Sequence, residues 1–358
     1  MLHNLKYFNG SLVMSVLGVL VGGGIGYYYS GTVSGAVQAA FIVSVLGILE
    51  VSLSFDNAVV NATVLKDMSD VWRHRFITWG IAIAVLGMRV VFPLAIVSVV
   101  GHIGPIAAVV MAATQPDAYA KLLVSAHVTV SAFGGAFLAM VALEHFLDEE
   151  KEVFWVSWIE RPLSKLGRVD TVQIGLVLLM LWGVSTQLVA EDQLRFIVAG
   201  ILGVVTFIAV GGIGELLKLM DGESNDGGGG EAVKGAVRNG LGAFLYLEVL
   251  DASFSFDGVI GAFALSNNLF IIAIGLGIGA LFVRSLTIML VEQGTLSEYR
   301  YLEHGAFYAI FSLAVIMFLK TFVEIPDVIT GLLGAGFITV ALYSSLRHNR
   351  IEDASNPE

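Results

Sequence analysis

Stretches of about 20 mostly apolar residues recur along almost the whole chain, and they constrain the fold more than any other feature. An apolar helix of about 20 residues crosses the hydrocarbon core of a bilayer. The composition agrees, because 56% of the residues are hydrophobic and only 14% are charged, against about 25% charged residues in soluble domains. We therefore expect an all-α, polytopic transmembrane bundle of about ten helices. The predicted helices cover 9–28, 34–62, 75–99, 128–147, 171–190, 194–217, 236–264, 269–291, 302–322 and 327–346.

Two other segments have apolar character but do not fit a span. Residues 103–127 are interrupted by Gly104, Pro105 and Pro116, so we expect a hairpin or an interfacial segment there. In residues 149–168, aromatic and aliphatic side chains fall on one helical face and charged side chains on the other. This pattern predicts a helix that lies in the membrane interface.

The distribution of basic residues predicts the orientation. With the N-terminus in the cytoplasm, fourteen Lys and Arg residues fall in the cytoplasmic segments and three in the outer segments. This asymmetry follows the positive-inside rule. We predict a multi-pass protein of the inner (plasma) membrane of the cell, with both termini in the cytoplasm.

The chain contains one motif twice. Residues 50–57 (EVSLSFDN) return as residues 251–258 (DASFSFDG), with Ser-x-Ser-Phe-Asp in register and an acid at the start. Each copy is followed, one helix later, by a lone arginine in an apolar stretch, Arg89 or Arg284. In the helix after that, Gly-Ala-Phe recurs at 135–137 and 305–307.

The two copies are predicted to have opposite orientations in the membrane. They occupy the second to fourth and the seventh to ninth predicted helices, and the five crossings between them are an odd number. Inverted-topology repeats are typical of secondary transporters, whose substrate sites lie near the membrane midplane where the repeats meet. A duplication that supplied only a scaffold is the alternative.

This repeat divides the chain into six parts. They are an N-terminal transmembrane helix (1–33), a first repeat (34–148), an interfacial segment with two helices (149–220), a flexible acidic linker (221–231), a second repeat (232–323), and a last transmembrane helix with a cytoplasmic tail (324–358).

Acidic side chains lie deep in the two motif helices. A charge at the bilayer centre costs at least ~2.5 kcal/mol on insertion scales, so buried charges mark functional sites. Arg89 and Arg284 can neutralise two of the acids and leave three, which are either protonated or hold a cation. The acids are Glu50, Asp56, Glu248, Asp251 and Asp257.

Helical spacing sorts these side chains into faces. Oxygen-bearing side chains form two stripes at helical spacing, and these are Glu50, Ser54, Asn57 and Asn61 on the first motif helix and Glu248, Asp251 and Ser255 on the second. In regular helices Asp56 and Asp257 point away from the stripes. Either they pair with Arg89 and Arg284, or each helix breaks near Ser-Phe-Asp and turns them inward. Gly258 favours a break in the second copy.

The donor set predicts the class of ion. Carboxylate, amide and hydroxyl oxygens suit hard divalent ions such as Mn²⁺, Mg²⁺ and Ca²⁺, and no His lies in the motif helices. We predict a divalent metal site formed by Glu50, Asp56, Asn57, Glu248, Asp251 and Asp257, with Ser54, Asn61, Ser255, Arg89 and Arg284 in support. The alternative is a set of buried Asp–Arg pairs and protonated acids that only pack the two halves together.

Other functions lack support in the residues. The formal net charge of −11 argues against a nucleic-acid partner, and no nucleophile pair, cofactor loop or Cys predicts an enzyme or an organic cofactor. Leu-Glu-His occurs at 143–145 and again at 302–304. We interpret these two copies as helix-end residues that are capped or solvated.

The motif segments and the two buried arginines resemble the TerC family of integral membrane proteins, in particular its longer bacterial branch. The resemblance covers roughly 35–160 and 236–346, and it extends to residues 135–137, 147–151 and 158–160. It implies membership of a wider group of inverted-repeat exporters that also handles lysine, with several relatives associated with manganese efflux. The second copy departs from the family pattern at Gly258, where an Asn is expected.

The leading hypothesis is therefore a transporter that moves a divalent cation, most simply Mn²⁺, out of the cytoplasm, with Ca²⁺ and Mg²⁺ as alternatives. A second hypothesis is a non-transporting membrane partner that binds metal or proteins during export or assembly. A third is an exporter of a small organic cation. The expected partners are the lipid bilayer, the cation and, under the second hypothesis, another membrane protein, while the oligomeric state stays open.

Overall fold

The structure is a computed structural model that describes residues 6–80, 82–167, 171–220, 240–263, 265–294 and 298–355. Across these ranges the chain is helical and has no strand, so the predicted all-α fold is confirmed. The predicted linker 221–231 lies outside the described residues.

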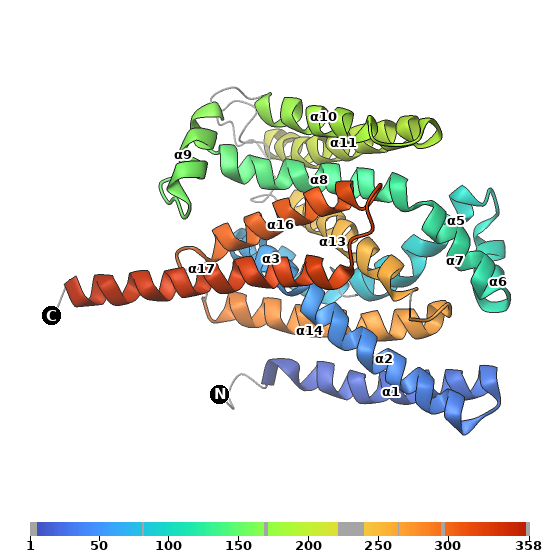
Figure 1. Cartoon of the computed structure of the whole chain (residues 1–358). Coiled ribbons are helices and arrows are strands. Elements are labelled where there is room, and N and C mark those ends of the chain that lie inside the picture. The colour runs from blue at the N-terminus through green and yellow to red at the C-terminus, as the bar shows by residue number, and fades with distance from the viewer. Residues whose placement is uncertain are drawn as a thin grey trace.

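The long helices lie side by side along one common direction, as in a bundle that crosses a membrane (Figure 1). Within the described ranges, seven helices are long and apolar enough to span a bilayer, and eight if one bent pair is counted as a single span. The seven are α1 (Asn9–Ser30), α2 (Val33–Leu53), α8 (His127–Leu147), α11 (Ala190–Met220), α14 (Leu269–Glu292), α16 (Leu302–Leu319) and α17 (Asp327–Ser355).

Two other predicted spans are helical but fall short of this criterion. α10 (Val172–Ser185) has only 14 residues, and α13 (Gly240–Ala262) carries three acids along its length. The bundle is therefore membrane-spanning, and the predicted number of ten crossings stays a prediction.

The first motif copy lies in a broken helix. α2 ends at Leu53, and α3 (Phe55–Asp67) begins after Ser54, whose φ of −108° and ψ of 19° interrupt the helix. Serine hydroxyls compete with helical hydrogen bonds, and the Ser54 hydroxyl donates to the Glu50 carboxylate. In the second copy α13 runs through Gly258 without a break. The prediction that Gly258 breaks the second copy was wrong.

The helix after the first motif is also irregular. It comprises α4 (Asp70–Arg75), the π-helical segments η2 (Phe76–Gly80) and η3 (Ile83–Val91), and α5 (Phe92–Val100). Its two parts are bent by 42°. Its counterpart in the second half, α14, is a regular helix of 24 residues. π-Helical turns occur frequently at functional sites, so the first half carries the distorted backbone.

Two short elements lie at the ends of the bundle. The interrupted segment 103–127 forms a hairpin of two ten-residue helices, α6 (Pro105–Thr114) and α7 (Pro116–Ser125). α9 (Ser157–Leu166) crosses the direction of the long helices, at the end of the bundle opposite α6 and α7 (Figure 1). This orientation is that of a helix lying in the membrane plane.

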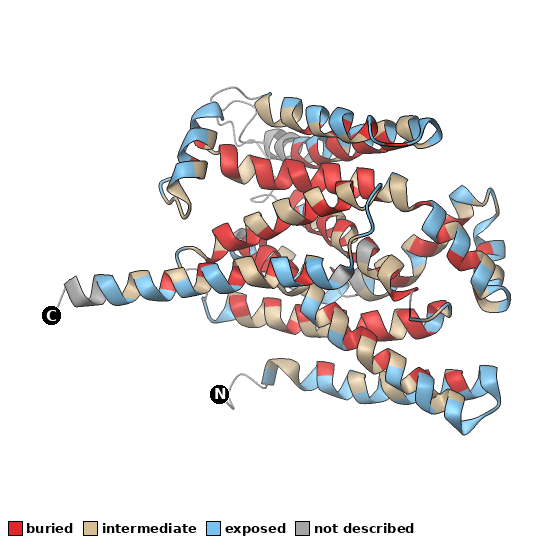
Figure 2. Ribbon diagram, viewed as in Figure 1, coloured by how far each residue is buried: buried red, intermediate tan, exposed pale blue. Residues whose placement is uncertain are grey.

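The most deeply buried helix is α8, which packs against α11, α13 and α16 (Figure 2). α1 lies at the edge and contacts α2 and α14. It is joined to α2 by a tight turn in which Gly31 has a φ of 65°, a conformation that suits glycine. The apolar side chains that α1 exposes are those that lipid would cover.

Both ends of the described chain lie at the same end of the bundle (Figure 1). The chain has no Cys, so single introduced cysteines can test the orientation without labelling of any native thiol. We expect Glu149→Cys and Arg347→Cys to react with a membrane-impermeant maleimide only from the cytoplasmic side, and Gln187→Cys only from the outer side. All three side chains are exposed. Labelling of 149 and 187 from the same side would contradict the arrangement.

Candidate functional site

A cavity lies between the two motif helices and the helices that follow each of them. It offers about 50 Å³ to the centres of water-sized molecules, several times the roughly 10–15 Å³ that one water requires. Most of the predicted site residues line it. Its polar lining is Glu50, Ser54, Asn57, Asn61, Arg89, Glu248, Asp251, Arg284 and Thr287.

Arg89 joins the two halves across this cavity. Its Nη2 donates to Glu50 Oε1 at 2.6 Å, and its Nη1 lies 3.5 Å from Asp251 Oδ2. Glu50 and Asp251 are the first acids of the two motif copies, so one guanidinium serves both. One of the two alternatives for Asp56, a pair with Arg89, was wrong, because Arg89 contacts Glu50 and Asp251 while Asp56 lies against α17.

Asn57 forms the second contact between the copies. Its Nδ2 donates to Asp251 Oδ1 at 2.8 Å, and both groups are buried. The matching position in the second copy is Gly258, where an added Cβ would lie 3.2 Å from Glu50 Oε2. The motif positions of the two copies therefore face each other reciprocally. Because Gly258 has no amide, the hydrogen bonds that Glu50 accepts from described residues come from Arg89 and Ser54.

Among the described acids that line the cavity, Glu248 is the one with no hydrogen bond to either oxygen. Its side chain is buried in the cavity wall, and neither of its oxygens has a hydrogen-bond partner. It lies against Gly80 of η2, where a Cβ would be 3.2 Å from Oε1. The Oδ1 atoms of Asn57 and Asn61 are also buried without partners. An unpaired carboxylate and two amide oxygens thus line one enclosed space.

Arg284 lines the same cavity from α14. It donates to the backbone carbonyl of Ile77 in η2, and its Nε is buried without a partner. Among the described residues no carboxylate forms an ion pair with it. Its predicted partner, Asp257, has a side chain that lies outside the described residues.

The lining charges do not cancel. Glu50, Glu248 and Asp251 face Arg89 and Arg284, so with all five groups ionised the cavity carries one negative charge. An unbalanced charge within the bilayer is costly. The cavity therefore favours a bound cation or a proton.

Two predicted site residues lie outside the cavity lining. Asp56 is buried against α17, where a Cβ at Gly334 would be 2.9 Å from its Oδ2, and its Oδ1 accepts the backbone N–H of Asn57. Ser255 is buried, and its hydroxyl has no partner. Gly80 and Thr287 line the cavity and were not predicted, because neither carries a charge or lies in the repeated motif.

The arrangement is not a preformed metal centre of three acids. In the part of the chain that the structure describes, no group of three or more His, Asp or Glu side chains is placed to hold a metal ion. Glu50 is hydrogen-bonded to Arg89, whereas Glu248, Asn57, Asn61 and Asp251 Oδ2 offer oxygens without hydrogen-bond partners, although Asp251 Oδ2 lies 3.5 Å from Arg89. A hard cation would therefore be held by Glu248, amide oxygens and retained water, with Asp251 Oδ2 joining them if Arg89 moves.

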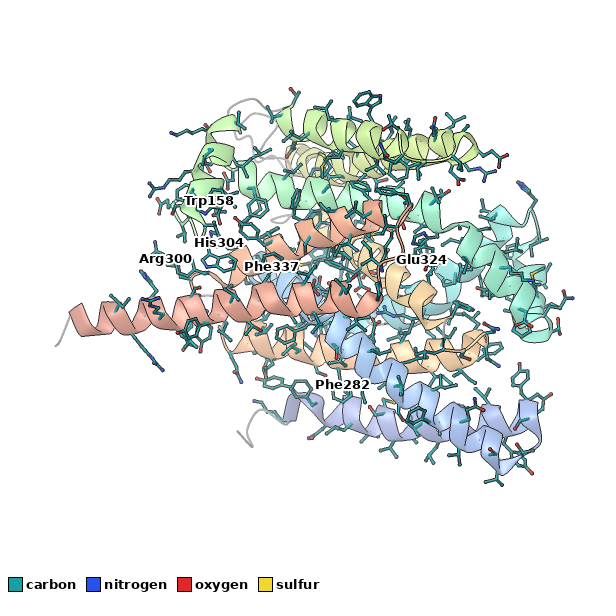
Figure 3. All side chains as sticks on the ribbon, viewed as in Figure 1. Trp158, Phe282, Arg300, His304, Glu324 and Phe337 are labelled. Atoms are coloured by element: carbon teal, nitrogen blue, oxygen red, sulfur yellow. The ribbon has the colours of Figure 1, made fainter. Side chains whose placement is uncertain are left out.

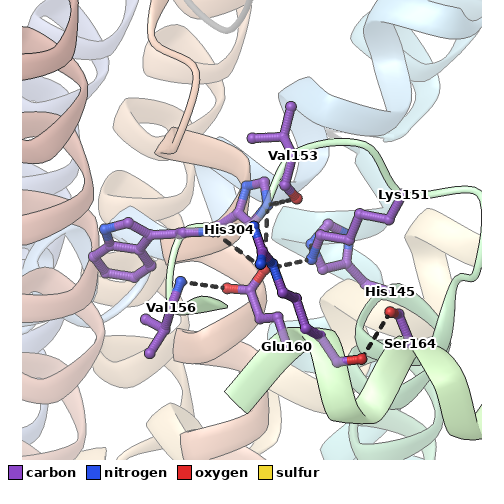
Figure 4. Close-up of polar contacts among 9 residues, drawn as sticks. His145, Lys151, Val153, Val156, Glu160, Ser164 and His304 are labelled. Atoms are coloured by element: carbon purple, nitrogen blue, oxygen red, sulfur yellow. Dashed lines mark hydrogen bonds and ion pairs between the residues drawn. The ribbon is translucent and has the colours of Figure 1, made fainter. Parts of the chain in front are cut away.

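A second buried polar cluster lies at the end of the bundle that carries α9 (Figure 4). Glu160 is fully buried and lies 3.0 Å from the Lys151 ammonium and 3.5 Å from His304 Nε2. It also accepts the backbone N–H of Val156 at 3.0 Å. His145 Nε2 lies 3.1 Å from the Lys151 ammonium. These contacts fasten the 151–160 segment to α8 and α16.

The sequence interpretation missed this cluster. The two Leu-Glu-His copies were interpreted as separate helix ends, yet the rings of His145 and His304 lie 5.3 Å apart, and His145 stacks on Phe307 at 3.8 Å. The recurrence of Leu-Glu-His at 143–145 and 302–304 was the sequence signal that could have indicated a contact between the two histidines. Figure 3 shows His304, Trp158 and Arg300 toward this end of the bundle and Glu324 farther along it.

Comparison with known proteins places most of the chain in one family. The family described as "Protein of unknown function (DUF475)" matches residues 55–352. No curated protein and no solved structure matches the chain.

The Glu160 cluster yields a stability prediction. Burial raises the pKa of the Glu160 carboxyl, but the Val156 N–H and the Lys151 ammonium lower this pKa by more, and the net pKa lies below its ordinary value. Glu160→Gln leaves Lys151 without its counter-ion, and breaking a buried pair costs about 3–5 kcal/mol. We expect a lower Tm for purified Glu160→Gln at pH 7 than for the unaltered protein. The exposed Glu152→Gln is the matched control and should melt like the unaltered protein.

The pH dependence follows from the sign of this pKa change. A carboxylate with a lowered pKa contributes stability above its ordinary pKa, and this contribution is lost as the pH falls through the folded-state pKa. The Tm difference between the unaltered protein and Glu160→Gln should therefore shrink toward acid pH. Equal melting of the two proteins at pH 7 would show that the ion pair does not hold the segment.

Proposed function

The chain belongs to the DUF475 family, whose description assigns no activity. We propose that this protein is an integral membrane transporter of a divalent metal cation, with Mn²⁺ as the first candidate. One observation carries the proposal. Glu248 is a buried carboxylate without a hydrogen-bond partner, in a cavity that is large enough for several waters and lies inside an apolar bundle. Such groups mark ion pathways in membrane proteins.

The donor chemistry supports a hard cation. The oxygens of the cavity lining without hydrogen-bond partners belong to two carboxylates, Glu248 and Asp251, and to two amides, and this set suits Mn²⁺, Mg²⁺ and Ca²⁺. Among the three, the resemblance of the motif segments to the TerC family favours Mn²⁺, because several relatives of that family are associated with manganese efflux.

The position of the cavity supports loading from the cytoplasm. The lining residues of α13 and α14 lie between Glu248 and Asp251 and between Ala280 and Ile288, nearer the helix ends that the basic residues predict as cytoplasmic. Toward the other end, the same helices pack into an apolar cluster. That cluster includes Leu46, Val97, Phe256, Val259, Ile272 and Leu276. The cavity is thus closed on the outer side by apolar packing.

This asymmetry suggests how the cation would cross. Secondary transporters with inverted repeats expose a midplane site alternately by rocking one repeat against the other. Here the Arg89 bridge and the Asn57–Asp251 contact join the copies at the site. The outer apolar cluster has to separate for release, and the break at Ser54 and the π-helical segments provide backbone that can move.

A second candidate function is a membrane partner that assists export or assembly. The outward face of α9 favours it, because Trp158 is 79% exposed and is accompanied by the exposed Arg161 and Lys165. A deletion strain separates the two functions. Manganese sensitivity with raised cellular manganese supports transport, whereas normal metal content with defective secreted enzymes supports the partner function.

Metal binding tests the site directly. We expect purified protein to bind Mn²⁺ in isothermal titration calorimetry, and Glu248→Gln and Asp251→Asn to weaken the affinity by about tenfold or more, the range for altered metal-site residues. Asp56→Asn is the matched control, since it removes a buried acid of the same motif that does not line the cavity. Its affinity should stay close to that of the unaltered protein.

The control also decides between two arrangements. Weakening by Asp56→Asn with unchanged binding in Glu248→Gln would move the site to the far side of α3 and contradict the proposal. Mn²⁺ uptake into proteoliposomes, reduced in Glu248→Gln and retained in Asp56→Asn, extends the test from binding to transport.

A further inference from the structure

The two arginines of the cavity differ in their surroundings. Arg89 contacts two carboxylates, Glu50 and Asp251. Arg284 donates to one backbone carbonyl, that of Ile77, and its Nε is buried without a partner. A guanidinium has five N–H donors and no acceptor. Most of the hydrogen-bonding capacity of Arg284 is therefore left for a ligand or for water in the cavity.

Glu248, on a neighbouring wall of the cavity, is a carboxylate that lacks a hydrogen-bond donor. Both groups adjoin η2, Arg284 at Ile77 and Glu248 at Gly80. Yet they form no ion pair with each other, and Glu248 has no hydrogen-bond partner. One cavity thus presents a cationic and an anionic side chain, each without an opposite charge in contact among the described residues.

Charge balance indicates what fills this space. With the five described ionisable groups of the lining charged, their charges sum to one negative charge, and a bound divalent cation changes this sum to one positive charge. A single monoanion at Arg284 brings the total to zero. A total charge of zero for the lining groups and the bound ions is favoured within a bilayer, where each uncompensated charge is costly.

We propose that Arg284 forms an anion subsite that binds a small carboxylate-class monoanion together with the divalent cation. The planar guanidinium fork matches a carboxylate through two parallel N–H···O bonds. The proposal deepens the proposed function and rests on it, because both subsites share one cavity. The transported unit is then a cation with a charge-balancing anion.

The subsite predicts reciprocal coupling between the two ligands. Acetate is the probe, and chloride at equal ionic strength, which lacks a carboxylate group, is the background anion. We expect acetate to raise the Mn²⁺ affinity in calorimetry roughly tenfold, within the usual range of coupling between sites. By linkage, Mn²⁺ should raise the acetate affinity by the same factor.

Variants at Arg284 separate the subsite from general effects of salt. Arg284→Gln should abolish the acetate enhancement, because it removes the guanidinium fork that would hold the carboxylate. Arg284→Lys keeps the charge but not the fork, so it should retain only part of the enhancement. Arg195→Gln removes an exposed arginine on α11 and should behave like the unaltered protein. Equal acetate enhancement in Arg284→Gln would overturn the proposal.

A metal-free measurement keeps the two proposals distinguishable. Saturation-transfer NMR of acetate on the full-length protein without metal should give a signal that Arg284→Gln loses and Arg195→Gln keeps. If acetate binds in this way but Mn²⁺ does not bind, the metal proposal fails and the anion subsite stands. If Mn²⁺ binds at Glu248 and acetate neither gives a signal nor alters the Mn²⁺ affinity, the anion subsite is refuted and the proposed function stands. The anion subsite is also refuted if Arg284→Gln gives an unchanged acetate signal while its size-exclusion profile shows that it is folded.

Discussion

The requirement that buried charge be compensated within lipid organises this molecule. Arg89 meets it for two acids at once, because its guanidinium contacts Glu50 and Asp251 from opposite halves of the chain. Removing one partner of a buried pair leaves an uncompensated charge, which is strongly unfavourable. The bridge therefore fixes how the motif helices meet, and it leaves Glu248 as the acid without a partner in the cavity. The proposed cation site follows from this division.

The two motif copies are alike in sequence and unlike in backbone. In the first copy the helix is interrupted at Ser54 and is followed by π-helical turns, whereas α13 and α14 are continuous. Asn57 donates to Asp251, while the matching Gly258 lies close beside Glu50 and has no amide to offer. The reciprocal geometry is thus preserved with one amide instead of two, and the irregular backbone is concentrated in the first half.

Much of the architecture was predictable, because apolar length and repeated motifs report directly on membrane helices and on which of them are equivalent. The partners of individual charges were not predictable in the same way. Helical spacing placed Asp56 away from the oxygen-bearing stripe, but it left open whether Asp56 pairs with Arg89, and only the packing of α3 shows that it lies against α17. The contact of His145 with His304 depends on how α8 and α16 pack at one end, and spacing within one helix carries no information about that packing.

The most direct measurement is an anomalous difference map, recorded at the manganese edge from crystals of the full-length protein grown with Mn²⁺. If the cavity is the cation site, we expect a peak inside it, at a coordination distance of about 2.0–2.6 Å from a Glu248 oxygen. A cavity without a peak, with manganese bound only to surface acids, would contradict it. So would a structure in which Glu248 pairs with Arg284 and leaves no space between them.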